Sequence, residues 1–230
     1  MQTIPRPDRR LLSAVPYLTR GGKCIDVGTD HAYLPIYLVK EGIVSRALAC
    51  DINQGPLQSA REHILAAGLE GVVETFLTDG LCGLEDYHPD DVMIFGMGGE
   101  LIIKILSDSP WVQNESIGLI LQPMSRANLL RKYLTENGFE IMGETLSESG
   151  KIYQTVYARF SGKKSVYNEE ELLLGRLNIQ NNPPLFADFV RHELSVWQKV
   201  LMGKARSATA DTEEERGMIR ILTQRLEKLL

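Results

Sequence analysis

Acidic residues and glycines recur where apolar runs give way to helical patterns. The first such group is Asp26, Gly28, Thr29, Asp30 and His31, within DVGTDHA. Glycine lets the backbone turn tightly and approach a ligand, and carboxylates attract cationic groups. A pyrophosphate site would prefer glycine where Asp30 stands. The group therefore favours a cationic cofactor, S-adenosylmethionine, over a dinucleotide, although Asp30 can also be read as a helix N-cap.

Two further acids close the second and third apolar runs. Asp51 can accept hydrogen bonds from both ribose hydroxyls of a nucleoside, with Ile52 offering an apolar surface to the adenine. Asp79 can accept from the adenine amine while Gly80 allows the turn, although an ordinary strand-ending turn explains this pair equally well. Acids after three successive runs together strengthen the interpretation as a cofactor site.

Two more loops are expected to border the same crevice. Gly96, Met97 and Gly98 follow the fourth run, where a methyltransferase presents the cofactor methyl to the acceptor atom. Gln122 follows the fifth run and can contact a base edge, and Ser125 is expected to cap the next helix. The candidate catalytic residues are Asp30, preferred because a carboxylate stabilises a base that becomes cationic, and Gln122.

Strand-like runs alternate with helical patterns as far as residue 160. Most of the runs are continuously apolar, which is typical of strands covered on both faces. The runs are Lys23–Gly28, Arg46–Ile52, Val72–Asp79, Asp91–Gly96 and Ser116–Gln122. The helical patterns are Arg9–Leu18 ahead of the first run and then Ala32–Glu41, Pro56–Ala67, Gly99–Leu106 and Ser125–Asn137.

The rhythm changes after Gly138. Phe139–Thr145 and Ile152–Phe160 are separated only by LSESGK, which is too short for a helical crossover. We therefore expect an α/β protein with a Rossmann-like, class I methyltransferase sheet: five parallel strands plus an antiparallel edge hairpin. A dinucleotide dehydrogenase would normally continue with further strand–helix units instead.

The remaining chain is helical in pattern. Residues 161–167 indicate a linker, and apolar residues then recur at spacings of three and four from Phe186 to Leu201 and from Ile219 to Leu229. Ser207–Thr212 indicates a turn, with Asp211 a candidate cap for the last helix. We expect a methyltransferase domain over residues 1–160 and a C-terminal α-helical coiled-coil hairpin over 161–230.

Composition excludes some classes of protein and leaves others open. No apolar run approaches the ~20 residues needed to cross a bilayer, so no membrane partner is expected. Cys24, Cys50 and Cys82 form no paired motif, and the histidines are scattered, so we expect small buried thiols in the cytoplasm and no metal site. The oligomeric state is not indicated.

The net charge of −5 argues weakly against a nucleic-acid partner, but its distribution does not. The first 23 residues contain one acid, Asp8, and five basic residues that predict a local basic surface: Arg6, Arg9, Arg10, Arg20 and Lys23. Such a surface is either a solvated face or an RNA-binding one.

Five motifs together resemble the bacterial TrmK family: DVGTDHAYLP at 26–35, ACDI at 49–52, TDGL at 78–81, FGMGGE at 95–100 and LQPMS at 121–125. The similarity runs from about Arg10 to Phe160, and that family also ends in a helical hairpin. Its members methylate N1 of the adenine at position 22 of tRNA. The resemblance implies S-adenosylmethionine as the methyl donor and tRNA as the substrate.

A tRNA substrate requires contacts beyond the cofactor site. The target adenine must be extruded from folded RNA, and His31 and Tyr33 can contact it, although His31 can also be structural. The helical hairpin is expected to help to grasp the tRNA. The expected phosphate contacts are Arg9, Arg10, Arg20, Arg126, Arg131 and Lys132.

Three other functions stay open. A methyltransferase of small molecules or proteins would share the cofactor site, and the acidic net charge favours it. An NAD-dependent oxidoreductase is disfavoured by the incomplete glycine pattern and the terminal hairpin. A nucleotide-binding module without catalysis would need an activity assay to exclude it.

Overall fold

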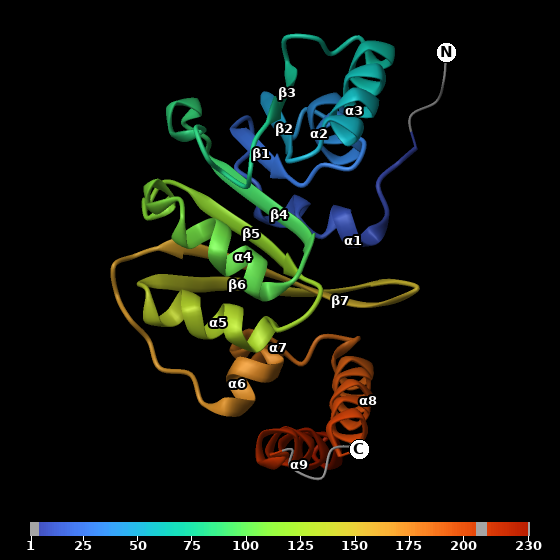
Figure 1. Ribbon diagram of the computed structural model, residues 1–230, viewed down its shortest axis with the longest axis vertical. Coiled ribbons are helices and arrows are strands. Elements are labelled where there is room, and N and C mark those ends of the chain that lie inside the picture. Colours follow the sequence, from blue (N-terminus) through green and yellow to red (C-terminus); the bar gives the residue numbers. More distant parts are fainter. Residues whose placement is uncertain (1–4, 206–210, 230) are drawn as a thin grey trace.

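A seven-stranded sheet runs through the first part of the chain in the computed structural model, which describes residues 5–205 and 211–229 (Figure 1). The strands are β1 (Lys23–Val27), β2 (Arg46–Asp51), β3 (Val73–Leu77), β4 (Asp91–Met97), β5 (Gly118–Pro123), β6 (Phe139–Ser149) and β7 (Lys151–Phe160). Their order is β3-β2-β1-β4-β5-β7-β6. The first five pair in parallel and the last two are antiparallel, as the sequence predicts.

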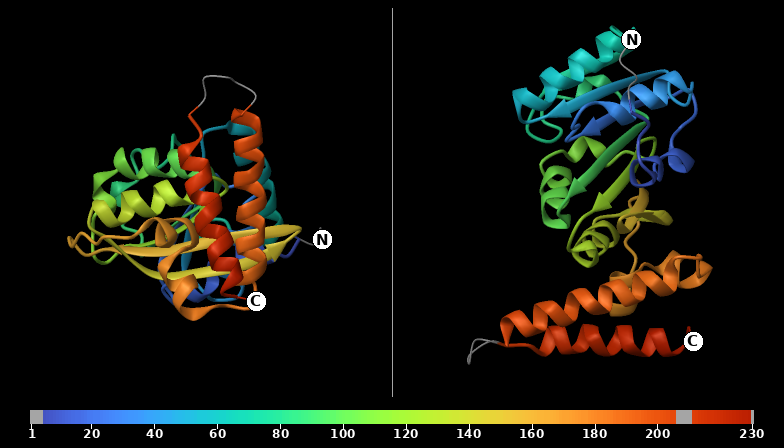
Figure 2. Two further views of the ribbon diagram at one scale, coloured as in Figure 1. Left: turned by 90° about the horizontal axis from the view of Figure 1, so that it is seen from below. Right: turned by 90° about the vertical axis from the view of Figure 1, so that its right-hand side faces the viewer.

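Helices cover both faces of the sheet, which explains the continuously apolar strands (Figure 2). Ile25 and Leu48 face one core, whereas Cys24 and Ala47 face the other. The first core is closed by α4 (Gly99–Ser107) and α5 (Ala127–Glu136), the second by α2 (Tyr33–Lys40) and α3 (Gln54–Ala67). Alternate residues of each strand are therefore buried on opposite faces.

The alternative reading of Asp30 as a helix cap is excluded, and the predicted cap at Ser125 is wrong. Helix α2 begins at Tyr33 after Ala32, which has a left-handed backbone (φ 54°), so Asp30 does not cap it. Helix α5 begins at Ala127 after Arg126, also left-handed (φ 56°), and Ser125 makes no cap hydrogen bond. In both loops the chain turns abruptly from strand to helix, which leaves the expected cap outside the first turn.

The predicted helix Arg9–Leu18 is divided. Helix α1 (Arg9–Leu12) is capped by Asp8, and a 3₁₀ turn, η1 (Val15–Tyr17), follows because Pro16 interrupts the pattern. Tyr17 lies against β6 at Gly143, where a Cβ would overlap its ring, and stacks on Tyr157 at 5.1 Å. This packing fixes the N-terminal segment over the β6–β7 hairpin.

The hairpin is longer than predicted. LSESGK does not form a loop, because pairing continues to Ser149 and Lys151 and Gly150 alone turns the chain (φ 74°). Strand β7 lies between β5 and β6, so of the two hairpin strands only β6 is at an edge of the sheet.

Residues 161–168 contain neither helix nor strand, as expected of a linker. Two short helices that the sequence pattern did not predict, α6 (Glu169–Leu174) and α7 (Arg176–Asn181), precede the long pair α8 (Phe186–Lys204) and α9 (Glu213–Glu227). The long pair lies side by side at one end of the molecule (Figure 2). The predicted turn lies largely outside the described residues; Asp211 Oδ1 accepts from Glu213 N at 3.0 Å.

Two 3₁₀ turns, η2 (Glu85–Tyr87) and η3 (Pro110–Val112), complete the elements of the described chain. Cys24 and Cys50 are buried as expected, whereas Cys82 is exposed, which corrects that prediction. Among the described residues, no helix has the length and apolar character to cross a membrane.

Candidate active site

The carboxyl ends of β1 to β4 meet at one edge of the sheet (Figure 1). Strands β1 and β4 are neighbours, but the chain continues from them to opposite sides, towards β2 and towards β5. Open α/β sheets bind ligands at such a switch point, outside the strand ends. Asp26, Gly28 and Gly96 all lie there.

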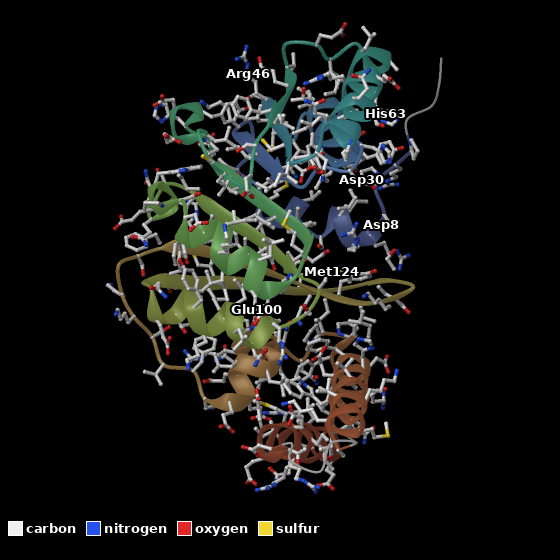
Figure 3. The ribbon with its side chains drawn as sticks, viewed as in Figure 1. Asp8, Asp30, Arg46, His63, Glu100 and Met124 are labelled. Carbon is white, nitrogen blue, oxygen red and sulfur yellow. The ribbon has the colours of Figure 1, made fainter. Side chains whose placement is uncertain are left out.

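A cavity of about 450 Å³ opens at this switch point. Its walls come from the ends of β1 and β4 and from the N-terminal segment around α1, where Asp8 lies close to Asp30 (Figure 3). The cavity brings together these residues singled out in the sequence: Arg10, Asp26, Gly28, Thr29, Asp30, His31, Tyr33 and Gly96.

Gly28 is required by its surroundings. Its backbone is left-handed (φ 77°), and a Cβ there would overlap the Met97 side chain. The amides of Gly28 and Thr29 both donate to the carbonyl of Cys50, at 2.8 and 2.9 Å. A tight turn at the end of β1 is thereby tied to β2, which leaves the inner wall of the cavity without a side chain at Gly28.

Asp26 is an acid buried beneath the cavity. Its residue is 7% exposed. Burial raises the pKa of Asp26 to about 6, while the Thr29 side chain and the Arg10 guanidinium limit the rise. At neutral pH the carboxyl is therefore mainly ionised, and a bound cation would compensate its cost of burial.

Arg10 lies inside the site rather than on an open basic surface. Its Nη1 donates to Gln122 Oε1 at 3.0 Å, and its Nε lies 3.7 Å from Asp8 Oδ2. A Cβ on Gly96 would be 3.7 Å from Nη1. The guanidinium, whose side chain is 23% exposed, therefore reaches from α1 to the ends of β4 and β5 with some of its donors facing the cavity.

Gln122 is fully buried at the end of β5. Its Oε1 accepts from Arg10 Nη1, and its Nε2 donates to the Arg10 carbonyl at 3.1 Å. A contact between Gln122 and a base edge, which stays a prediction, would compete with these bonds. In this arrangement the amide holds Arg10 in place.

Aromatic rings gather beside Asp30 at the rim of the cavity. His31 and Tyr33 lie 5.1 Å apart, and His63 of α3 is 5.6 Å from His31 and 5.0 Å from Tyr33. His63 Nδ1 is 3.1 Å from the His31 carbonyl. The Asp30 side chain is largely exposed, with Oδ1 3.5 Å from His31 Nε2. The rim thus offers flat rings and one accessible carboxylate.

The other two acids lie outside the walls of this cavity. Asp51 is half-buried at the end of β2, and its Oδ1 accepts from Asn53 N at 2.8 Å, beside Ile52, which is 61% exposed. Asp79 is exposed, and Gly80 (φ 62°) packs on Ile105 of α4. These side chains extend the strand-end row away from Asp26, towards solvent.

The loop after β4 is locked to the loop after β5. Met124 N donates to the Met97 carbonyl, and Gly99 N donates to the Ser125 carbonyl, both at 2.8 Å. A Cβ on Gly99 would lie 2.5 Å from the Arg126 carbonyl. The Gly98 carbonyl accepts from Ile102 N, so the carbonyls of Met97 and Gly98 are already engaged.

Comparison with known proteins fits this geometry. Residues 8–156 match a methyltransferase domain family. The chain is 30% identical to the Bacillus subtilis tRNA (adenine(22)-N(1))-methyltransferase, with 96% of this chain and 94% of that protein covered. The chain belongs to the TrmK family of tRNA methyltransferases.

Two solved structures of similar proteins contain the cofactor or its product. A Streptococcus pneumoniae protein in complex with S-adenosylmethionine is 28% identical, with a TM-score of 0.83 and coverage of 95% of this chain and 99% of that one. TrmK of M. capricolum in complex with S-adenosylhomocysteine is 25% identical, with a TM-score of 0.79 and coverage of 97% and 99%.

The structure corrects one of the predicted phosphate contacts on this TrmK chain. Arg131 is fully buried, with Nε 2.7 Å from Glu144 Oε1, and no phosphate can reach it. Arg9, Arg20 and Arg126 are exposed, and Lys132 is exposed beside Glu136. The available cations are therefore distributed over α1, the segment after it and the start of α5.

Sequence reasoning missed Asp8 and His63. Asp8 caps α1 through Leu11 N at 2.9 Å and also accepts from Ser149 Oγ. The signal for Asp8 was its position before a helical pattern; for His63, on a separate helix, no local signal existed. Within the described residues, no group of three potential metal ligands occurs.

Proposed function

We infer that the protein transfers a methyl group from S-adenosylmethionine to N1 of the adenine at position 22 of tRNA. Membership of the TrmK family supports this, and the site supports it independently. The single observation that carries it is the cavity at the β1–β4 switch point. This cavity contains both a buried carboxyl, that of Asp26, and a guanidinium, that of Arg10, with hydrogen-bond donors left for a ligand.

The cavity has the charges that the methionine part of the cofactor requires. Asp26 and Asp30 provide negative charge for its ammonium and sulfonium groups, and Arg10 provides the donors for its carboxylate. Gly28 presents backbone rather than a side chain to the cavity. The zwitterionic end of the cofactor therefore matches the arrangement of opposite charges.

The nucleoside part of the cofactor extends along the strand-end row. Asp51 is placed to accept the ribose hydroxyls, with Ile52 as an exposed apolar surface for the adenine. Asp79 and Gly80 border the far end, where the carboxylate is accessible to an exocyclic amine. Gly96, Met97 and Gly98 bound the end at which the methyl is transferred.

S-adenosylmethionine supplies a methyl group already activated by its sulfonium. The acceptor is a neutral ring nitrogen with an available lone pair, so the residues mainly orient the two reactants. The base becomes cationic on methylation, and Asp30 is the accessible carboxylate at the rim that stabilises this charge. Gln122 acts through Arg10 as a positioning residue.

The extruded adenine is received at the rim by His31 and Tyr33, whose rings lie 5.1 Å apart. Arg9 on α1 and Arg126 before α5 are exposed and available for phosphate contacts. The same proposal places the protein in the cytoplasm, where tRNA is used, and assigns it no metal and no membrane partner.

The test is to map the methylated nucleotide. Incubation with S-adenosylmethionine and a tRNA transcript should give 1-methyladenine at position 22, and a transcript with guanosine at that position is the matched control. Equal methylation of the control, or none of either RNA but methylation of a protein or small molecule, would overturn the proposal. Stabilisation by NAD but not by S-adenosylhomocysteine in a thermal shift would overturn the cofactor assignment.

A further inference from the structure

A second cavity, here called the junction cavity, lies between the β5–α5 loop and helix α8. Its volume is about 220 Å³, below the ~300–1,000 Å³ of pockets for drug-sized ligands. Met124 and Arg126 form one side, and Glu193, Val196 and Trp197 of α8 form the other. Its walls mix polar and apolar side chains, and its size suits one flat ring system.

Glu193 is an unusual group for such a wall. It is half-buried, and burial raises the pKa of its carboxyl to about 7, an effect that the Arg131 charge only partly offsets. Among residues 5–205 and 211–229, no hydrogen bond or ion pair engages it. The neighbouring His192 has a lowered pKa because of burial, Lys151 and Lys199, so it is mainly uncharged at neutral pH. Because this carboxyl lines the cavity, it can accept a hydrogen bond from a ligand that enters.

The junction cavity adjoins the site of methyl transfer. Ser125 forms part of its wall, and a Cβ on Gly98 would lie only 3.2 Å from Ser125 Oγ. Met124, which also lines it, lies on the same flank as Asp8 and Asp30, between them and α8 (Figure 3). One short loop therefore separates the two cavities.

Arg126 adds a cation at the rim. It is exposed and has a left-handed backbone (φ 56°), a strained conformation for a non-glycine residue that is concentrated at functional sites. A phosphate requires a cation such as Arg126, a base face requires an apolar surface such as Val196 and Trp197, and a base edge requires an acceptor such as Glu193.

We propose that the junction cavity receives a second nucleobase of the RNA, one next to the methylated adenine. This rests on the proposed function. Extrusion of the target unstacks its neighbours, and the cavity gives one of them a new apolar contact against Val196 and Trp197. Glu193 accepts an N–H from the base edge, and Arg126 binds the adjoining phosphate. No covalent step is involved.

Filling the cavity tests the proposal. Val196→Trp introduces a large ring at a position that is 38% exposed on its rim, and the KM for tRNA should rise about tenfold while the affinity for S-adenosylmethionine is unchanged. Met202→Trp is the matched control, because Met202 is exposed on α8 but does not line the cavity, and it should behave like wild type. Equal KM values for all three proteins would overturn the proposal.

Glu193→Leu provides a second test, in which the Tm and the KM for tRNA distinguish a role in RNA binding from a purely structural role. Replacing this half-buried carboxyl by an apolar group should raise the Tm by about 2–4 °C. The loss of a negative charge should by itself favour RNA binding. We nevertheless expect the KM for tRNA to rise about fivefold. A lowered Tm, or a tRNA KM equal to or below that of wild type, would overturn the assignment of Glu193.

The two proposals fail separately. Absence of 1-methyladenine with the wild-type protein contradicts the proposed function. If the wild-type protein methylates tRNA but Val196→Trp and Glu193→Leu keep its KM, the reaction stands and the second base site does not.

Discussion

Two arginines in this molecule are each held by a glutamine, yet they have different roles. Arg10 donates to Gln122 at 3.0 Å and Arg131 donates to Gln154 at 2.7 Å. Arg131 is fully buried and also donates to Glu144 and to the carbonyls of Leu172 and Leu173, at 2.7–3.2 Å. Arg10 is half-buried, and some of its donors face the cavity.

The two arginines differ in how many of their hydrogen-bond donors remain available to a ligand. The Arg131 cluster joins α5, the β6–β7 hairpin and α6, and Glu144 also accepts from Leu177 N at 2.9 Å. Its hydrogen bonds are used to fix the C-terminal helices to the sheet. Arg10 is positioned by fewer contacts, which leaves it free to bind an anion. An arginine saturated by protein groups is structural, and one that is only oriented is available for function.

The largest effect is expected from breaking the saturated cluster. Arg131→Ala leaves Glu144 buried without its counter-charge, which should lower the free energy of unfolding by about 3–5 kcal/mol. Chemical denaturation followed by circular dichroism measures this. Arg131→Met combined with Glu144→Gln removes both charges and should recover much of the loss. If the double variant is as unstable as Arg131→Ala, the ion pair is not the source of the effect.

Asp26, which shares the cavity with Arg10, should show the opposite sign. Its pKa of about 6 in the folded state exceeds the usual value of 3.8, so its stabilising contribution is present below pH 4 and lost as the pH rises through 6. Asp26→Asn should therefore stabilise the ligand-free protein by up to about 3 kcal/mol at pH 8.

The stabilisation by Asp26→Asn should shrink to about half at pH 5, and the variant should lose affinity for S-adenosylmethionine. Urea denaturation at both pH values and calorimetric titration measure these effects. The exposed Asp86, changed to Asn, is the control and should alter neither quantity. A destabilised Asp26→Asn protein at pH 8 would contradict a strained, ligand-directed carboxyl.

The third effect, on the affinity for S-adenosylmethionine, should distinguish Arg10 from Arg9. Arg10→Ala removes charge-assisted hydrogen bonds to the cofactor carboxylate, each worth about 1.5–3 kcal/mol, so the Kd for S-adenosylmethionine should rise roughly 10–100-fold. Arg9→Ala, one residue away and exposed, should leave that Kd unchanged and raise the KM for tRNA a few-fold. Calorimetric titration of both variants decides, and equal Kd values would remove Arg10 from the cofactor site.

The contrast between these arginines also shows where sequence reasoning succeeds. Asp26, Gly28 and Gly96 were found because their roles depend on local order: a strand end followed at once by a turn. Arg131 was placed wrongly on the surface, because a basic residue in an amphipathic helix usually faces solvent. Its burial depends on Glu144, 13 residues away, and on carbonyls 41 and 42 residues away. Partners at that separation leave no pattern in a single sequence.

The fold follows the same division. The five parallel strands lie within two residues of their predicted bounds, since both faces of the sheet are covered and the strands are continuously apolar. Helices α6 and α7 were missed because six-residue segments carry too few turns for a periodic pattern. Their positions are set by tertiary contacts, including the Glu144 carboxylate against Gly175, where a Cβ would overlap it.

The smallest effect should come from Arg176, whose side chain is the most exposed of these three arginines. It contacts Glu171 through Nε at 2.7 Å and lies 3.8 Å from the Tyr167 ring centroid, but its side chain is 31% exposed. Solvent competes with these contacts, so Arg176→Ala should cost only about 1 kcal/mol of stability, without changing the Kd for S-adenosylmethionine. Denaturation in low and high salt measures it, and Arg176→Lys, which keeps the charge but not the paired geometry, should lose part of the same amount. Arg176 and Arg131 both pair with a glutamate and differ mainly in exposure. If Arg176→Ala lost as much stability as Arg131→Ala, burial would not control how much these arginines contribute to the free energy of unfolding.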